Sequence, residues 1–100
     1  MTGLDDCFTE GNLRNVTPSE GKAIESLEVA RAYLQEARQV LPAGNPRLAT
    51  SGVYMAWSHA ARAVLLRDGV RERTHYCVEQ YLSTYVVSGK LDPKWVTMLE

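Results

Sequence analysis

The stretch GVYMAWSHAARAVLL, residues 52–66, decides the fold of this chain. It is apolar almost all the way round, and its only polar side chains are Tyr54, Ser58, His59 and Arg62. A helix that is apolar on every side must be surrounded by other elements. Gly52, Ala56 and Ala60 also recur at four-residue spacing and let a neighbouring helix approach closely. The stretch is therefore predicted to be the central helix of a small bundle.

A long amphipathic helix is predicted ahead of it, from about Pro18 to Val40. Thr17 is expected to cap this helix, with Pro18 at its first position. Apolar residues then recur at three- and four-residue steps, which is the helical period: Ala23, Ile24, Leu27, Ala30, Leu34, Ala37 and Leu41. The turn PAGNP, residues 42–46, is short, so the next helix must run antiparallel. Asn45 is its expected cap.

The central helix should end at Asp68-Gly69, because glycine readily adopts the left-handed conformation that terminates helices. Residues 70–73 are expected to form an elbow. Thr74 should cap a third helix that ends near Ser88-Gly89. An apolar stripe marks the inner face of that helix: Val78, Tyr81, Leu82, Tyr85 and Val86.

The two ends of the chain are expected to differ from this middle part. Residues 1–16 lack sustained periodicity and are predicted to be a loosely ordered N-terminal arm. Asp92-Pro93 should begin a short fourth helix with Trp95 inward, which the sequence leaves apparently incomplete at Glu100. Residues 17–100 are thus predicted to be a single all-α domain. Its expected architecture is an antiparallel up-and-down bundle of three long helices plus a short fourth.

Composition limits the function classes. With 100 residues and 45% hydrophobic content, the chain is one small domain, and a second copy is a reasonable cover for part of its core. A net charge of −1 argues against binding nucleic acid by bulk positive charge. The positive charge is local, since residues 41–75 carry five basic and two acidic side chains.

The cysteines and the absence of targeting signals favour a cytoplasmic protein. Cys7 and Cys77 are far apart in sequence and lack metal-ligand spacing, so both are expected to be reduced. Cys77 is interpreted as a small buried hydrophobe. Neither a signal peptide nor a membrane-spanning stretch is recognisable in the sequence.

The segment VYMAWSHAARAVLLRDGVRERTHYCVEQYLSTYVVSGKLDPKW, residues 53–95, carries a family resemblance. It resembles the small, stand-alone, uncharacterised branch of the HEPN superfamily, whose name refers to higher eukaryotes and prokaryotes nucleotide-binding. The features are the run from His59 to Ala63, the Gly69 break, the Thr74-His75 pair and the Ser88-Gly89 turn. The resemblance implies an antiparallel bundle of about four or five helices, frequently paired as a homodimer.

The resemblance also implies a choice of activities. Many HEPN proteins are metal-independent ribonucleases or toxins in which an Arg is followed, after four to six residues, by a His. Others are non-catalytic partners of small nucleotidyltransferases. Here Arg71 precedes His75 with three residues between them and Arg67 with seven, so the ribonuclease spacing is absent. An enzyme is therefore disfavoured, and His75, Arg71 and Arg62 are the only catalytic candidates, at a composite site of a dimer.

The elbow supplies the candidate phosphate- or nucleotide-binding residues. These are Arg67, Arg71, Arg73 and His75. Three guanidiniums near a helix N-terminus favour an anion and can form bidentate contacts with phosphate. The alternative is that Asp68 and Glu72 pair with these arginines and leave a merely solvated turn.

His59 and Arg62 share a face of the central helix and are a candidate buried polar or interface pair. They either face a cleft or partner, or are structural, with Arg62 bridging to an acid of the first long helix such as Glu28 or Glu36. No metal or cofactor is expected. The leading hypothesis is a homodimeric nucleotide- or RNA-phosphate-binding module. The alternatives are a ribonuclease toxin of a toxin–antitoxin pair, with an antitoxin partner, and a non-catalytic partner of a nucleotidyltransferase.

Overall fold

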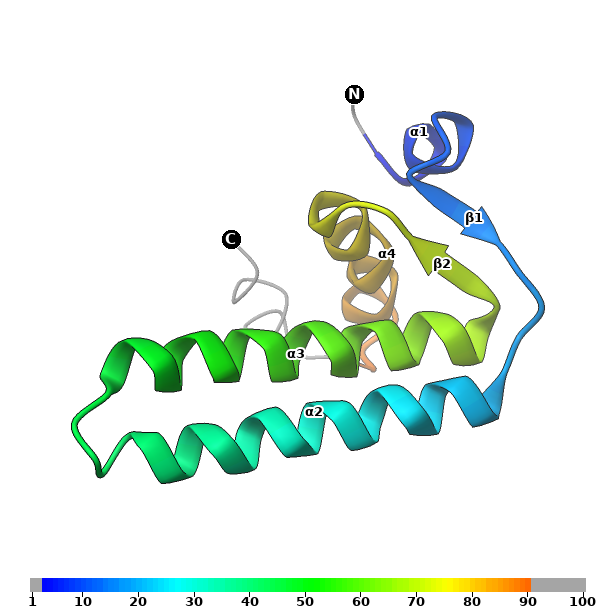
Figure 1. The fold of residues 1–100 in the computed structure, drawn as a ribbon. Helices are drawn as coiled ribbons and strands as arrows, with labels where there is room; N and C mark the ends of the chain where they lie inside the picture. The colour runs from blue at the N-terminus through cyan, green and yellow to red at the C-terminus, as the bar shows by residue number, and fades with distance from the viewer. Residues whose placement is uncertain (1–2, 91–100) are drawn as a thin grey trace.

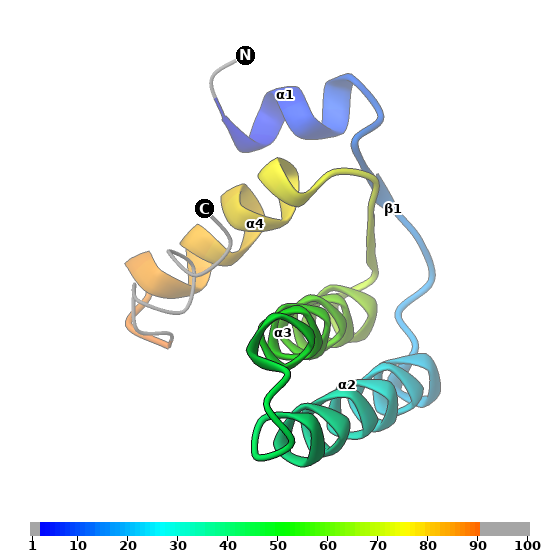
Figure 2. The same cartoon turned by 60° about the vertical axis from the view of Figure 1, so that its left-hand side comes forward.

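The computed structural model describes residues 3–90 of the chain. Its elements in order are α1 (Leu4–Thr9), β1 (Leu13–Asn15), α2 (Glu20–Val40), α3 (Pro46–Asp68), β2 (Val70–Glu72) and α4 (His75–Val87). Helices α2 and α3 form a long hairpin (Figure 1), and α4 lies on the side of α3 away from α2 (Figure 2). The predicted all-α architecture with a central helix is confirmed. The helix predicted from Asp92-Pro93, with Trp95, lies outside the described residues.

The predicted helix ends around α3 are largely confirmed. Pro46 occupies the first turn of α3, although the side chain of Asn45 makes no capping hydrogen bond. Gly69 has a φ of 84° and a left-handed conformation, and its N–H donates to the carbonyls of Leu65 and Leu66. The Thr74 hydroxyl accepts a hydrogen bond from the Cys77 N–H at 3.2 Å and so caps α4.

The start of α2 differs from the prediction. Ser19, rather than Thr17, is the N-cap, because its hydroxyl accepts the Lys22 N–H at 3.1 Å. The preceding residues are held against the end of α3 instead, where Val16 N–H donates to Gly69 O at 2.9 Å and Ser19 N–H donates to Leu66 O at 3.0 Å. Both Thr and Ser are good caps, so local propensity could not choose between them.

Small side chains allow α2 and α3 to approach closely, as the Gly52 spacing predicted. A Cβ atom at Gly52 would lie 3.1 Å from Ala37 Cβ and 3.3 Å from Tyr33 O. The main core lies on the other side of α3, against α4 and the N-terminal arm. Its buried residues are Cys7, Leu13, Ala61, Leu65, Val70, Cys77, Val78 and Leu82. Of the helices within residues 3–90, none is long and apolar enough to cross a bilayer.

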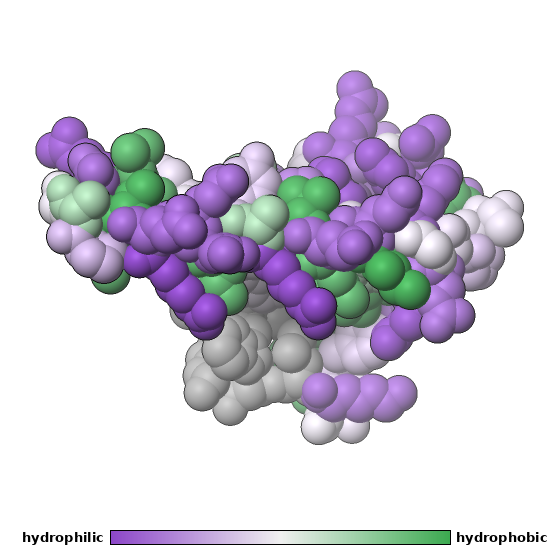
Figure 3. Space-filling model, turned by 60° about the horizontal axis from the view of Figure 1, so that its bottom comes forward, coloured by the Kyte–Doolittle hydropathy of each residue, from purple (hydrophilic) through white to green (hydrophobic). Residues whose placement is uncertain are grey.

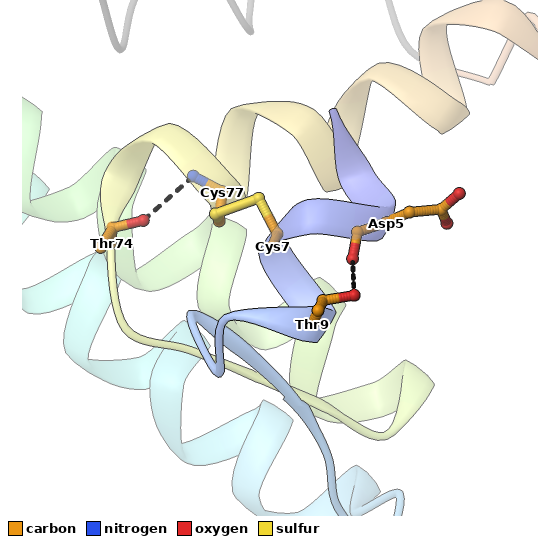
Figure 4. Close-up of a disulfide and its surroundings, with 5 residues drawn as sticks. All are labelled: Asp5, Cys7, Thr9, Thr74 and Cys77. Atoms are coloured by element: carbon orange, nitrogen blue, oxygen red, sulfur yellow. Dashed lines mark hydrogen bonds between the residues drawn. A yellow bond between two sulfur atoms is a disulfide. The ribbon is translucent and has the colours of Figure 1, made fainter. Parts of the chain in front are cut away.

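The N-terminal arm was predicted to be loose, but the structure gives it a helix, a strand and a covalent anchor. Cys7 of α1 and Cys77 of α4 form a disulfide with Cα atoms 5.8 Å apart, and both side chains are fully buried (Figure 4). The expectation of two reduced cysteines is therefore wrong. Their wide sequence separation concealed a pairing that only the fold creates. The pairing also removes the reason for which the cysteines favoured a reducing cytoplasm.

Candidate functional site

A basic hollow lies where the small sheet meets the start of α2. Strands β1 and β2 are antiparallel, and Arg14 lies directly opposite Arg71. Both arginines and Lys22 line a hollow of about 330 Å³, whose other walls are Val16, Thr17 and Leu66. Among residues 3–90, no acidic side chain lines this hollow. We call this feature the Arg14–Arg71 hollow.

The pleat of the sheet explains why these arginines face outward together. Leu13 and Val70 are buried in the main core, and side chains alternate between the two faces of a strand. Arg14 and Arg71 therefore share the opposite, exposed face. Cα atoms of directly opposed residues lie only about 5 Å apart in an antiparallel pair. Among residues 3–90, neither arginine nor Lys22 forms an ion pair, so this positive charge is uncompensated.

His59 and Arg62 were predicted to be a polar pair on the central helix, and Arg62 forms an ion pair with an acid on β2. Arg62 Nε donates to Glu72 Oε2 at 2.7 Å. The acid therefore lies on β2 and not on the first long helix, where the structural alternative placed it at a residue such as Glu28 or Glu36. His59 stacks on Tyr33 with ring centroids 5.7 Å apart. Burial lowers the pKa of His59, and the Arg62 guanidinium lowers it further, while Glu72 partly opposes both. The three residues form a structural polar cluster that ties β2 to α3.

Arg73 and His75 lie on another side of the elbow. Together with Ser58, Arg62 and Thr74 they line a small cavity of about 110 Å³. The Nδ1 atom of His75 lies 3.0 Å from the Tyr54 hydroxyl, and the two rings stack with centroids 5.4 Å apart. One ring nitrogen of His75 is therefore already used within the fold.

Arg67 belongs to a third cluster, at the C-terminal end of α3. Its Nε atom lies 3.4 Å from Asp68 Oδ1, and Asp68 also accepts hydrogen bonds from the hydroxyls of Tyr81, at 2.9 Å, and Tyr85. Burial disfavours the charged form of Asp68. The hydroxyls of Tyr85 and Tyr81 and the Arg67 guanidinium outweigh this effect and hold the pKa of the carboxyl below its usual value. Asp68 thereby joins α3 to α4.

Comparison with known proteins places the chain in a family. Residues 23–99, more than half of the chain, match the family described as HEPN domain. The chain belongs to the HEPN family. It has no match among curated proteins or among solved structures. The family agrees with the all-α architecture, whereas the N-terminal arm that the disulfide anchors lies outside the matched residues.

The elbow residues of this HEPN domain do not converge on one point. Arg71 lines the Arg14–Arg71 hollow, Arg73 and His75 line the small cavity, and Arg67 pairs with Asp68. Of these four residues, Arg71 lies within β2, Arg67 lies in α3, and Arg73 and His75 follow the end of the strand. The alternative that acids near the elbow neutralise its arginines therefore holds for Arg67 but not for Arg71.

Two of the catalytic candidates of the HEPN domain, Arg62 and His75, line the same small cavity, whereas the third, Arg71, does not. Arg62 is paired with Glu72, His75 contacts Tyr54, and Arg71 lines a different hollow. Within the described part of the chain, no group of three or more His, Cys, Asp or Glu side chains could hold a metal ion.

Sequence reasoning missed two residues of the hollow, Arg14 and Lys22. Arg14 lies in the segment that was expected to be loose, and Lys22 was one of several charges on an amphipathic helix. The sequence Leu13-Arg14-Asn15 has one apolar residue followed by two polar ones and shows no alternation, so no local signal indicated a strand with an outward arginine.

The Asp68 cluster should make stability fall at both pH extremes. Because folding lowers the pKa of Asp68, its stabilising effect is present above about pH 4 and is lost as the pH falls through the folded pKa. Burial and the Asp68 carboxylate raise the pKa of Tyr81, so its effect is present below about pH 10 and is lost at higher pH. Melting temperatures of the wild type and Asp68→Asn, followed by circular dichroism across pH, should differ most between about pH 4 and pH 10, and the difference should shrink on either side. The variant Tyr76→Phe, at an exposed tyrosine, is the control and should retain the wild-type profile. Parallel profiles for the wild type and Asp68→Asn would contradict the prediction.

Proposed function

We propose that this HEPN domain is a nucleotide- or RNA-phosphate-binding module that contacts phosphate at the Arg14–Arg71 hollow. One observation carries the proposal: two arginines are directly opposed across a strand pair beside Lys22, with no acid in the walls. Like charges in directly opposed positions destabilise a sheet. An anion between them turns this repulsion into charge-assisted hydrogen bonds, and guanidiniums match phosphate geometry especially well.

The proposed role is binding without catalysis. The Arg-to-His spacing of HEPN ribonucleases is absent from the sequence. His75 and Arg62, the side chains that would have to act, are engaged with Tyr54 and Glu72. The purified protein is accordingly expected to bind RNA and leave it intact.

A homodimer is part of the same proposal. An apolar groove of about 420 Å³ runs between α2 and α3 and reaches α4, with Leu27, Leu34, Val53, Trp57 and Leu82 among its walls. Leu27 and Val53 remain about two-fifths exposed, at 43% and 39%. Figure 3 shows the α2 side of the molecule, where apolar patches are separated by hydrophilic side chains. A second copy that covers this groove would leave the Arg14–Arg71 hollow open.

The decisive experiment is titration with a short RNA oligonucleotide that carries a 5′-phosphate. Amide signals of residues 14–17 and 70–72 should shift, and Arg71→Gln should weaken binding about tenfold or more, because a hydrogen bond to a charged group is worth about 1.5–3 kcal/mol. Arg47→Gln is the matched control, since Arg47 is an exposed arginine remote in sequence from the hollow. Light scattering on the same sample gives the number of chains per particle. Unchanged signals at millimolar RNA, or equal losses in the two variants, would refute the proposal.

A further inference from the structure

The Arg14–Arg71 hollow offers more donors than a phosphate within a nucleic-acid backbone can use. Its walls hold two guanidiniums, the Lys22 ammonium and the Thr17 hydroxyl. None of these four side chains has a hydrogen-bond or ion-pair partner within residues 3–90. A backbone phosphodiester presents two unbridged oxygens and one negative charge. A terminal phosphate monoester presents three strong acceptor oxygens and nearly two negative charges at pH 7.

Counting donors against acceptors therefore separates the two kinds of phosphate. Each arginine fork is best satisfied by two oxygens, so two opposed forks on a phosphodiester must compete for the same pair. Three oxygens let both forks bind while Lys22 or Thr17 takes a remaining lone pair. The charge leads to the same conclusion, because three cations facing one monoanion leave most of their mutual repulsion in place.

We infer that the hollow selects a terminal phosphate monoester, such as the phosphate of a nucleoside monophosphate or the 5′-phosphate of an RNA end. This inference rests on the proposed function and specifies its ligand. The position of the hollow fits an end group, since it is bounded by the sheet on one side and the start of α2 on the other. Specificity of this kind depends on Arg14, which lies in the disulfide-anchored arm, as much as on Arg71.

The test compares AMP with 3′,5′-cyclic AMP on the full chain, because the two share base and sugar and differ in monoester against diester. Calorimetry at pH 7.5 should show AMP binding at least tenfold tighter. The affinity for AMP should then fall as the pH is lowered through about 6, where the monoester gains its second proton. The affinity for cyclic AMP should stay constant.

The comparison of the two nucleotides also controls for effects of pH on the protein itself. Among residues 3–90, the charged side chains that line the hollow are Arg14, Lys22 and Arg71, and no histidine lines it. If a change of pH acts through histidines elsewhere in the protein, it should change the affinities for AMP and for cyclic AMP equally. In Arg14→Gln the preference for AMP over cyclic AMP should shrink, whereas Arg47→Gln should retain it.

The possible failures are distinguishable. Equal affinity for AMP and cyclic AMP, together with binding of the 5′-phosphorylated RNA, overturns the monoester inference and leaves the proposed function intact. An absence of binding to AMP, cyclic AMP and the RNA overturns both. An AMP affinity that ignores pH between 5 and 7.5 also overturns the inference, even if AMP binds more tightly, because the second negative charge would then play no part.

Discussion

Reduction of the Cys7–Cys77 disulfide is expected to lower the free energy of unfolding by about 4 kcal/mol. The bond spans a sequence separation of 70 residues, so it removes much of the conformational freedom of the unfolded chain. A small domain has a total stability of about 5–15 kcal/mol, and this loss corresponds to a fall in melting temperature on the order of 20 °C. Few other single changes in this chain should cost as much.

The measurement is thermal unfolding with and without a dithiol reductant. The wild type should melt at a much lower temperature after reduction, and Cys7→Ala/Cys77→Ala should resemble the reduced wild type in either buffer. Because both sulfurs are fully buried, reduction under native conditions should be slow and should accelerate in mild denaturant. Equal melting temperatures for the oxidised and reduced wild type would show that the disulfide does not support the fold.

The same reduction should weaken phosphate binding. Arg14 belongs to the arm that the disulfide anchors, and β1 reaches the rest of the chain through its pairing with β2 and the Val16–Gly69 and Asn12–Arg73 hydrogen bonds. An arm that detaches from α4 positions Arg14 less well. AMP affinity measured well below the melting temperature of the reduced chain reports this effect separately from global unfolding.

Replacement of Gly69 by alanine should cost about 3 kcal/mol, from two additive causes. The backbone φ of 84° disfavours any side chain, and this alone costs about 1–2 kcal/mol. A Cβ atom would also lie 2.8 Å from Val16 O and 2.8 Å from Pro18 Cγ. The first of these atoms is backbone, so the segment between β1 and α2 would have to move.

Gly44→Ala separates the two causes. Gly44 has nearly the same φ, 86°, but a Cβ atom there meets nothing within 4 Å. Its loss in urea unfolding should therefore report the backbone effect alone, and the excess in Gly69→Ala should report the collision with residues 16–18. Equal losses in the two variants would mean that the segment moves aside freely. The hollow would then also be adaptable, since Val16 and Thr17 form part of its wall.

Local signals accounted for most of the helical architecture. Pro46 at a helix start, Gly69 at a helix end and Thr74 as a cap each act within a few residues, so the sequence indicates them directly. The structure of the N-terminal arm instead depends on long-range contacts. Its three-residue strand and short helix are stabilised by partners about sixty to seventy residues away, and such contacts leave no local periodicity.

The candidate site was predicted in part for the same reason. Arg71 was predicted as a phosphate-binding residue of the elbow, and this stays a prediction; the structure gives it no acidic partner among the described residues. Its expected companions lie outside β2: Arg67 is in α3 and pairs with Asp68, and Arg73 follows the strand and lines the small cavity. The companions that it has, Arg14 and Lys22, depend on strand pairing across the chain.

The contacts of this chain fall into two groups by their separation along the sequence. Those of the α2–α3 hairpin are local, and those of the disulfide and the strand pair are long-range. Helices α2 and α3 are joined by a five-residue turn and meet through local contacts, which form quickly. The pairing of Leu13 with Glu72, and of Cys7 with Cys77, instead requires the two ends of that hairpin to be brought together first. We therefore expect closure of the arm to follow formation of the hairpin. The helical framework would then form before the surface that we propose to bind phosphate.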